Sequence, residues 1–180
     1  MHKLALLAAL VGCGGLSSDL EGIYEIGTWT QNPDACDVEG PSILEQQSQT
    51  LFYVRVENFL GQKFLNASLC DDLANCQSEA GSDTINLNGW AFDGGDDSNG
   101  WTGATVFAGG SGTECTGQVT DHLMTSSGPD TVLIESRTRE TLPFPVDSDG
   151  FCDTDQARAA AEGQPCITFE VVTATRTANL

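Results

Sequence analysis

The chain has 180 residues, which fits a single domain that is long enough to bury a hydrophobic core. It carries 26 acidic residues against 7 basic ones, so its formal net charge is −19. This balance argues strongly against a nucleic-acid partner, because binding there requires Lys and Arg to displace counterions, and it argues against a surface that lies flat on anionic lipid. The charge itself is typical of a highly soluble extracellular domain.

The first twelve residues have the order of an export signal. Met1 to Lys3 form a short basic start, residues 4–11 (LALLAALV) are an unbroken apolar run, and Gly12 is small. The run is too short to cross a bilayer as a helix, which needs about 20 residues. We therefore predict that residues 1–12 are a signal peptide and that the rest of the chain is exported.

The end of this leader resembles the lipobox of bacterial lipoproteins, with Leu10-Val11-Gly12-Cys13 as the matching residues. The resemblance implies a diacylglyceryl group on the Cys13 sulfur, cleavage before Cys13 and a further acyl chain on the new amino terminus. Several acyl chains would hold the protein firmly on a membrane. Gly14 stands where many Gram-negative lipoproteins have a retention aspartate, which favours the outer membrane or cell surface. The alternative is an ordinary signal peptide followed by a chance cysteine.

We expect residues 13–20 to form a lipidated flexible tether and residues 21–180 to form one domain. Six cysteines remain in that domain: Cys36, Cys70, Cys76, Cys115, Cys152 and Cys166. An even number in an exported chain predicts three disulfides, for which fifteen pairings exist. We favour Cys70–Cys76 and Cys152–Cys166, which leaves Cys36–Cys115. Because no two of the six form a C-x-x-C pair, a zinc or redox site is disfavoured.

Most of the domain has the alternating apolar pattern and the turn signals of antiparallel strands. Expected strands cover residues 24–30, 52–60, 63–69, 85–89, 101–108, 114–124, 131–139 and the segment that begins at 167. Asn99-Gly100 is a strong hairpin signal, whereas residues 31–50 have no clear period and are expected to be a long loop. The sequence therefore predicts an all-β fold of about eight antiparallel strands, either an up-and-down barrel or a sandwich.

One short helix is expected just before the last strand. Thr154 can cap it, the residues QARAAAE can continue it, and Gly163 and Pro165 can end it.

The domain also has a weak resemblance to lipocalins. Gly27-Thr28-Trp29 on the first expected strand resembles their Gly-x-Trp signature, and Thr120-Asp121-His122 resembles their Thr-Asp-Tyr turn. The resemblance implies a barrel whose Trp29 packs across the closed end beneath a basic residue near the C-terminus, a part that Arg176 could play. His122 in place of tyrosine, a helix that precedes the last strand, and three disulfides depart from the family pattern.

The sequence contains no catalytic set. His122 is the only histidine after the leader, and no nucleophile signature accompanies it, so we predict no catalytic residues and no cofactor. The best metal candidate is a calcium loop in residues 147–155, with Asp147, Asp149, Asp153 and Asp155 as ligands and a solvated acidic turn as the alternative. The tryptophans Trp29, Trp90 and Trp101 could line a ligand pocket, although large aromatic side chains more often fill the core.

These patterns favour a lipid-anchored, non-catalytic envelope or surface lipoprotein with a partner-binding or structural role. Its membrane contact would be through the N-terminal lipid, and the sequence identifies no protein partner. One alternative is a lipocalin-like binder of a small apolar ligand. Another is a secreted enzyme that uses paired carboxylates, although 26 acidic residues make such pairs common by chance.

Overall fold

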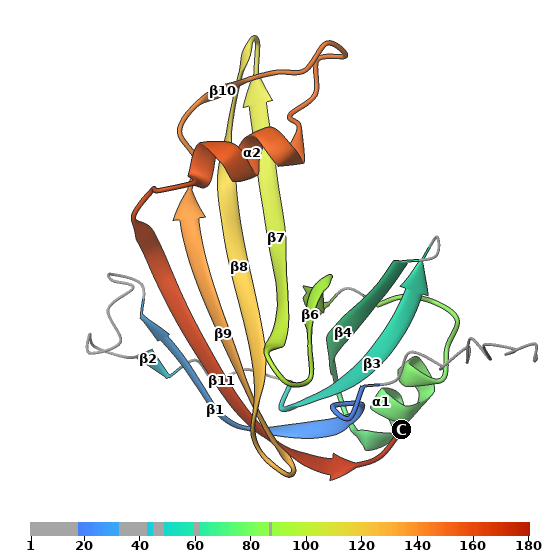
Figure 1. Cartoon of the computed structure of the whole chain (residues 1–180). Helices are drawn as coiled ribbons and strands as arrows, with labels where there is room; N and C mark the ends of the chain where they lie inside the picture. Colours follow the sequence, from blue (N-terminus) through green and yellow to red (C-terminus); the bar gives the residue numbers. More distant parts are fainter. Residues whose placement is uncertain (1–17, 33–42, 45–48, 60–61, 87) are drawn as a thin grey trace, which may run out of the picture.

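A computed structural model describes residues 18–32, 43–44, 49–59, 62–86 and 88–180. The predicted signal peptide, Cys13, Cys36 and most of the expected 31–50 loop lie outside the described residues, so the predictions on them stay predictions. Within the described part, the prediction of an all-β fold is confirmed. Strands dominate the chain and all of their pairings are antiparallel (Figure 1).

The strands form a meander that curls into a nearly closed barrel. They are β1 (Gly22–Asn32), β2 (Ile43–Leu44), β3 (Leu51–Phe59), β4 (Gln62–Cys70), β5 (Gly89–Phe92), β6 (Gly94–Asp96), β7 (Gly100–Ser111), β8 (Glu114–Gly128), β9 (Thr131–Glu140), β10 (Phe144–Pro145) and β11 (Cys166–Ala178). Hydrogen-bonded neighbours follow the order β5-β4-β3-β1-β11-β9-β8-β7-β6, with β2 beside β1 and β10 beside β8. Only Asp93 separates β5 from β6, so this bent segment joins both ends of the sheet. Of the two predicted forms, the up-and-down barrel is the one observed.

Gly103 on β7 permits the close approach that completes the barrel. A Cβ atom placed there would lie 2.0 Å from the carbonyl oxygen of Ala91 on β5, far inside any real contact. Any other residue would therefore push β5 and β7 apart, since only glycine lets two backbones approach this closely.

Aromatic side chains fill the closed part of the barrel. Tyr24 and Phe52 stack with their ring centroids 5.3 Å apart, and Trp90 meets Phe52 edge-on at 5.8 Å. The cluster consists of Leu20, Tyr24, Phe52, Val54, Leu65, Ala67, Trp90, Phe92, Trp101, Met124, Val132, Ile134, Val172 and Ala174. Such packing of large apolar side chains is the main source of stability in a β domain.

The inner face of the long strands changes from apolar to polar over three successive cross-strand rows. The rows are Trp101–Met124–Ile134–Val172, then Gly103–His122–Ser136–Glu170, then Thr105–Thr120–Thr138–Thr168. Side chains two residues apart share a face of a strand, so each row continues the wall of the row before it. The apolar core therefore ends at the row that contains His122.

Beyond that row the opposite face of the sheet is covered by α2 (Thr154–Ala161), as Figure 1 shows at the upper end of β7 to β9. Ala157 and Ala161 of this helix are buried, and Ala157 joins Cys115 and Phe144 in a separate apolar cluster. The predicted helix is confirmed, but its N-cap is Asp153, whose side chain accepts a hydrogen bond from the Gln156 backbone N–H at 2.9 Å.

A second helix, α1 (Leu73–Ala80), was not predicted. Asp72 caps its start by accepting a hydrogen bond from the Asn75 backbone N–H, and Gly81 ends it. Its buried residues, Cys76 and Ala80, pack with Ile23 and Tyr53 on the outside of the barrel. Because only two residues of this segment are buried, its sequence does not show the apolar periodicity of an amphipathic helix.

The disulfides correct one predicted pairing and confirm another. Cys70–Cys76 is present as predicted, whereas Cys152 pairs with Cys115, with Cα atoms 5.7 Å apart, and not with Cys166. The pairing of β10 with β8 brings Phe144 opposite Cys115, so the following loop reaches Cys115 first. The predicted pairs Cys152–Cys166 and Cys36–Cys115 were therefore wrong. Cys166 is itself disulfide-bonded.

Residues 18–20, which we expected to belong to the flexible tether, pack on the barrel instead. The Ser18 hydroxyl and the Asp19 backbone N–H both donate to the carboxylate of Asp97, at 2.5 and 2.9 Å. Leu20 is buried in the aromatic core. The Asp97 carboxylate and the apolar Leu20 side chain together fix the start of the described chain to one end of the barrel.

Candidate functional site

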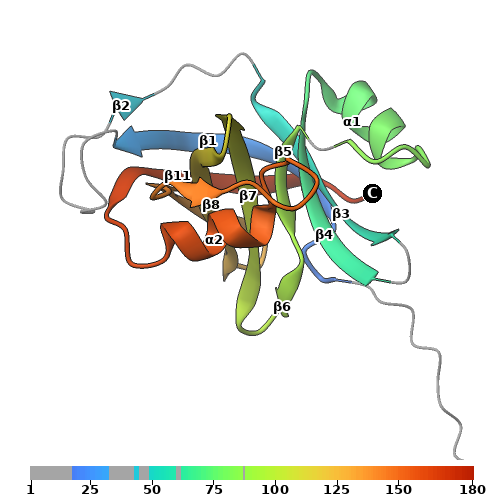
Figure 2. The same cartoon turned by 90° about the horizontal axis from the view of Figure 1, so that it is seen from above.

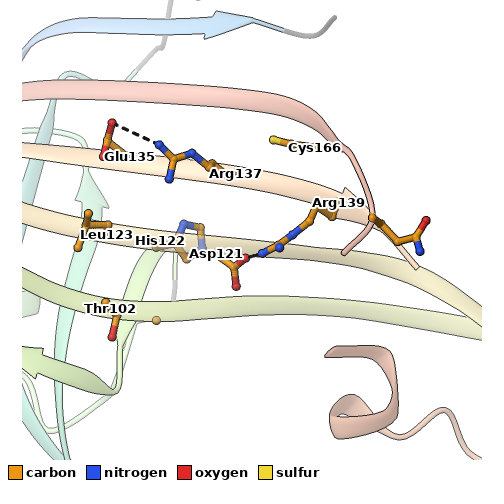
Figure 3. Close-up of a pocket in the computed structure, with 10 residues that line it drawn as sticks. Thr102, Asp121, His122, Leu123, Glu135, Arg137, Arg139 and Cys166 are labelled. Carbon is orange, nitrogen blue, oxygen red and sulfur yellow. Dashed lines mark ion pairs between the residues drawn. The ribbon is translucent and has the colours of Figure 1, made fainter. Parts of the chain in front are cut away.

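The clearest hollow lined by charged side chains is an open groove of about 500 Å³ on the outer face of β8 and β9. Figure 3 shows the side chains that line it. They are Thr102, Gly103, Asp121, His122, Leu123, Glu135, Arg137, Arg139, Gln164 and Cys166.

The period of two along β9 places the charges of this groove. Ile134, Ser136 and Thr138 stand in the inner-face rows, so Glu135, Arg137 and Arg139 point outward. On β8, Asp121 is the register partner of Arg137. These arginines were not among the site residues expected from the sequence. The signal that could have found them is ESRTR, in which charges occupy every second position.

Two ion pairs organise the groove. Arg139 pairs with Asp121, and a guanidinium nitrogen of Arg137 lies 3.9 Å from a carboxylate oxygen of Glu135; both pairs are drawn as dashed lines in Figure 3. The Arg137 side chain is 50% exposed, and its guanidinium lies 5.0 Å from the ring centroid of Phe169, close enough for a cation–π contact. Each pair is partly exposed, so each contributes little to the free energy of unfolding.

A smaller hollow of about 260 Å³ adjoins the groove at the Arg139–Asp121 pair. Arg158 and Glu162 of the α2 region line its other side. Three of the five arginines in the sequence therefore gather at two neighbouring hollows of a strongly acidic chain. The Nε atom of Arg139 is buried, and it has no hydrogen-bond partner among the described residues.

His122 borders the groove through β8 but faces the inner side of the sheet. Its Nε2 lies 3.0 Å from the Thr105 hydroxyl and its Nδ1 lies 2.8 Å from the Ser136 hydroxyl. Burial lowers the pKa of His122 from 6.5 to about 4, so the imidazole is neutral at pH 7. The neutral ring can hydrogen-bond to both hydroxyls, which favours a structural role for His122 within the sheet. Its lowered pKa makes it a weak general base.

The four aspartates of the expected calcium loop lie apart in role. Asp147 accepts hydrogen bonds from the backbone N–H groups of Asp149 and Phe151, and Asp153 caps α2. Among the described residues, no group of three or more His, Cys, Asp or Glu side chains could hold a metal ion. Asp147 and Asp153 therefore bind nearby backbone N–H groups. The described structure does not gather Asp147, Asp149, Asp153 and Asp155 into one ligand group.

The three tryptophans are core residues more than pocket residues. Trp90 and Trp101 are each 5% exposed, and Trp29 packs partly buried against Trp90 at 5.3 Å. Trp101 also donates its indole N–H to Asp97 at 2.7 Å. Arg176 lies over Tyr24, at 5.5 Å from its ring centroid, and its described contacts do not include Trp29.

Comparison with protein-family models gives no matching family, and comparisons with curated proteins and with solved structures give no match either. Among the described helices, neither is long and apolar enough to cross a membrane.

Proposed function

We propose that the protein is a non-catalytic lipoprotein of the cell envelope, anchored through Cys13, that presents its α2 end to a binding partner. The observation that carries this proposal is that the start of the described chain, which follows Cys13, and helix α2 lie at opposite ends of the barrel. Arg176 donates to the Asp19 carbonyl, and its own backbone N–H donates to the Asp130 carbonyl at 2.7 Å. The described chain therefore starts at the end of the barrel that holds the β8–β9 turn.

The opposite end of β8 lies far from this anchor end. Glu114 begins β8 beside β10, whereas Gly128 ends it at the β8–β9 turn. At about 3.3 Å per residue, this strand separates its two ends by about 45 Å. In Figures 1 and 2, α2 and β10 cover the far end. The five residues that lead from Cys13 to Ser18 can extend at most about 17 Å. Lipid on Cys13 would therefore keep the end of the barrel that holds the β8–β9 turn close to the membrane.

The packing supports a binding role over the two alternatives. Aromatic side chains occupy the inside of the closed half, where an apolar ligand would have to sit, and the hollows at Arg137 and Arg158 are open and lined by charged side chains. For an enzyme that uses paired carboxylates, the two acids that line the groove would have to act as acid and base, yet Glu135 and Asp121 are each ion-paired with an arginine.

The test is metabolic labelling of the full-length chain with a fatty-acid probe in a bacterium that processes lipoproteins. We expect label on the wild-type protein and its recovery in the membrane fraction, and loss of both in Cys13→Ser. The matched control combines Cys13→Ser with Ser17→Cys, which keeps the number of thiols but moves one away from the lipobox. Equal labelling of Cys13→Ser, or an unlabelled wild-type chain with Met1 intact, would contradict the anchor.

A further inference from the structure

We propose that the groove between β8 and β9 binds a small ligand that bears carboxylate groups, with Arg137 and Arg139 as its contacts. This goes beyond the anchored role and does not depend on it, because the groove is complete without the lipid. The sites that bind small molecules usually combine a concave surface with a few convergent polar groups, and this groove has that form.

Two of the chain's five arginines, Arg137 and Arg139, line this groove. They stand on the same strand two residues apart, which places their Cβ atoms about 7 Å from each other on one face. A short diacid can reach both guanidinium groups across that spacing.

The two arginines of the groove have hydrogen-bond donors to spare. Each guanidinium carries five N–H donors. The ion pair of Arg137 with Glu135 has its closest approach at 3.9 Å, longer than a hydrogen bond. The buried Nε of Arg139 is unpaired within the described residues. These unused donors are available to the oxygens of a ligand that bears carboxylate groups.

A further argument concerns the kind of anion. The planar arginine fork matches the two oxygens of a carboxylate, and the Phe169 ring beneath Arg137 holds that fork in place. Inorganic phosphate is too short to reach both guanidinium groups across the spacing of Arg137 and Arg139, whereas the two ends of a short diacid can do so. The spacing therefore favours a diacid over inorganic phosphate.

The test is isothermal titration calorimetry of the purified full chain in detergent micelles, with succinate as the probe at fixed ionic strength. We expect saturable binding to the wild type and at least about tenfold weaker binding to Arg137→Gln, because a hydrogen-bonded charge contact is lost. Glu135→Gln should bind succinate more tightly, since it removes a competing acceptor and a repelling charge. Arg158→Gln is the matched control: it changes the net charge equally, lies outside the larger groove and should bind as the wild type does.

Several outcomes would overturn the proposal. They are equal affinity of Arg137→Gln and the wild type, weaker binding by Glu135→Gln, or inorganic phosphate that binds as tightly as succinate. The absence of saturable binding to a wild-type chain with a normal melting curve would do so too. Arg137 is half exposed, so its variant is expected to fold, and circular dichroism of each variant checks this. None of these results bears on lipid labelling at Cys13, so the two proposals fail separately.

Discussion

Two regions of the barrel differ in which face of the same strands is buried. In the closed half, around Phe52, the buried residues of β8 are Met124 and His122, which face inward. In the distal wall, which we define as residues 105–111, 114–120 and 138–140, the buried residues of β8 are Val119 and Cys115, which face α2. One strand thus belongs to two cores on opposite sides of the sheet. The alternation of buried and exposed residues along β8 changes phase between Val119 and His122, where one core ends and the other begins.

The largest expected effect is on the closed half. Phe52→Ala removes a fully buried ring that contacts Tyr24 and Trp90, so it should lower the free energy of unfolding by about 3–5 kcal/mol. Urea denaturation with intact disulfides measures it. Phe107→Ala, at a residue 76% exposed in the distal wall, is the control and should change stability by less than about 0.5 kcal/mol. Similar losses in both variants would mean that the wall shares the aromatic core.

The next prediction compares how much each of the two described disulfides contributes to the free energy of unfolding. Cys115–Cys152 spans 37 residues and fastens the loop of the distal wall, whereas Cys70–Cys76 spans 6. Loop-closure entropy predicts losses of about 4 and about 2 kcal/mol when each pair is replaced by serine. Urea denaturation of the two double variants compares them directly. A greater loss for the shorter loop would show that native-state packing around α1, and not chain entropy, governs their contributions.

The third effect is at the boundary row and depends on pH. Because burial lowers the pKa of His122 to about 4, the folded chain binds fewer protons there than the unfolded chain, whose histidine has a pKa near 6.5. Its contribution is complete above pH 6.5 and is lost as pH falls toward 4, by about 3 kcal/mol in all. Unfolding free energies of the wild type and His122→Gln over this range check it. Parallel curves would place the pH dependence on the carboxylates alone.

The fold could be predicted from sequence because strand signals are local. Alternation in residues 52–60 and the Asn99-Gly100 turn depend only on neighbours along the chain, and both agree with the strands found. The segment 85–89 was expected as a strand, but the strand begins only at Gly89, since residues 85, 86 and 88 belong to the connection from α1. The pairing of Cys115 with Cys152 depends on β10 beside β8, which no local pattern reveals.

The candidate groove was beyond sequence reasoning for a similar reason. Arg137 and Arg139 alternate with apolar and hydroxyl residues, a pattern that any solvated strand shows. Only the register with β8 places Asp121 beside them, and only the path after α2 brings Gln164 to the groove. The tryptophans were selected from the sequence, but their side chains suit a ligand pocket and a core equally well. Tertiary packing places Trp90 and Trp101 in the core.

The pairing of β1 with β11 has a consequence for how the chain reaches its native state. The Thr177 hydroxyl donates to the Ile23 carbonyl across 154 residues, and the whole seam joins the first strand to the last. Contacts of such long range slow folding, so this barrel is expected to mature over milliseconds to seconds. Until the last strand is in place, one edge of β1 is unsatisfied, so chaperone protection of that edge would matter most before the seam has formed.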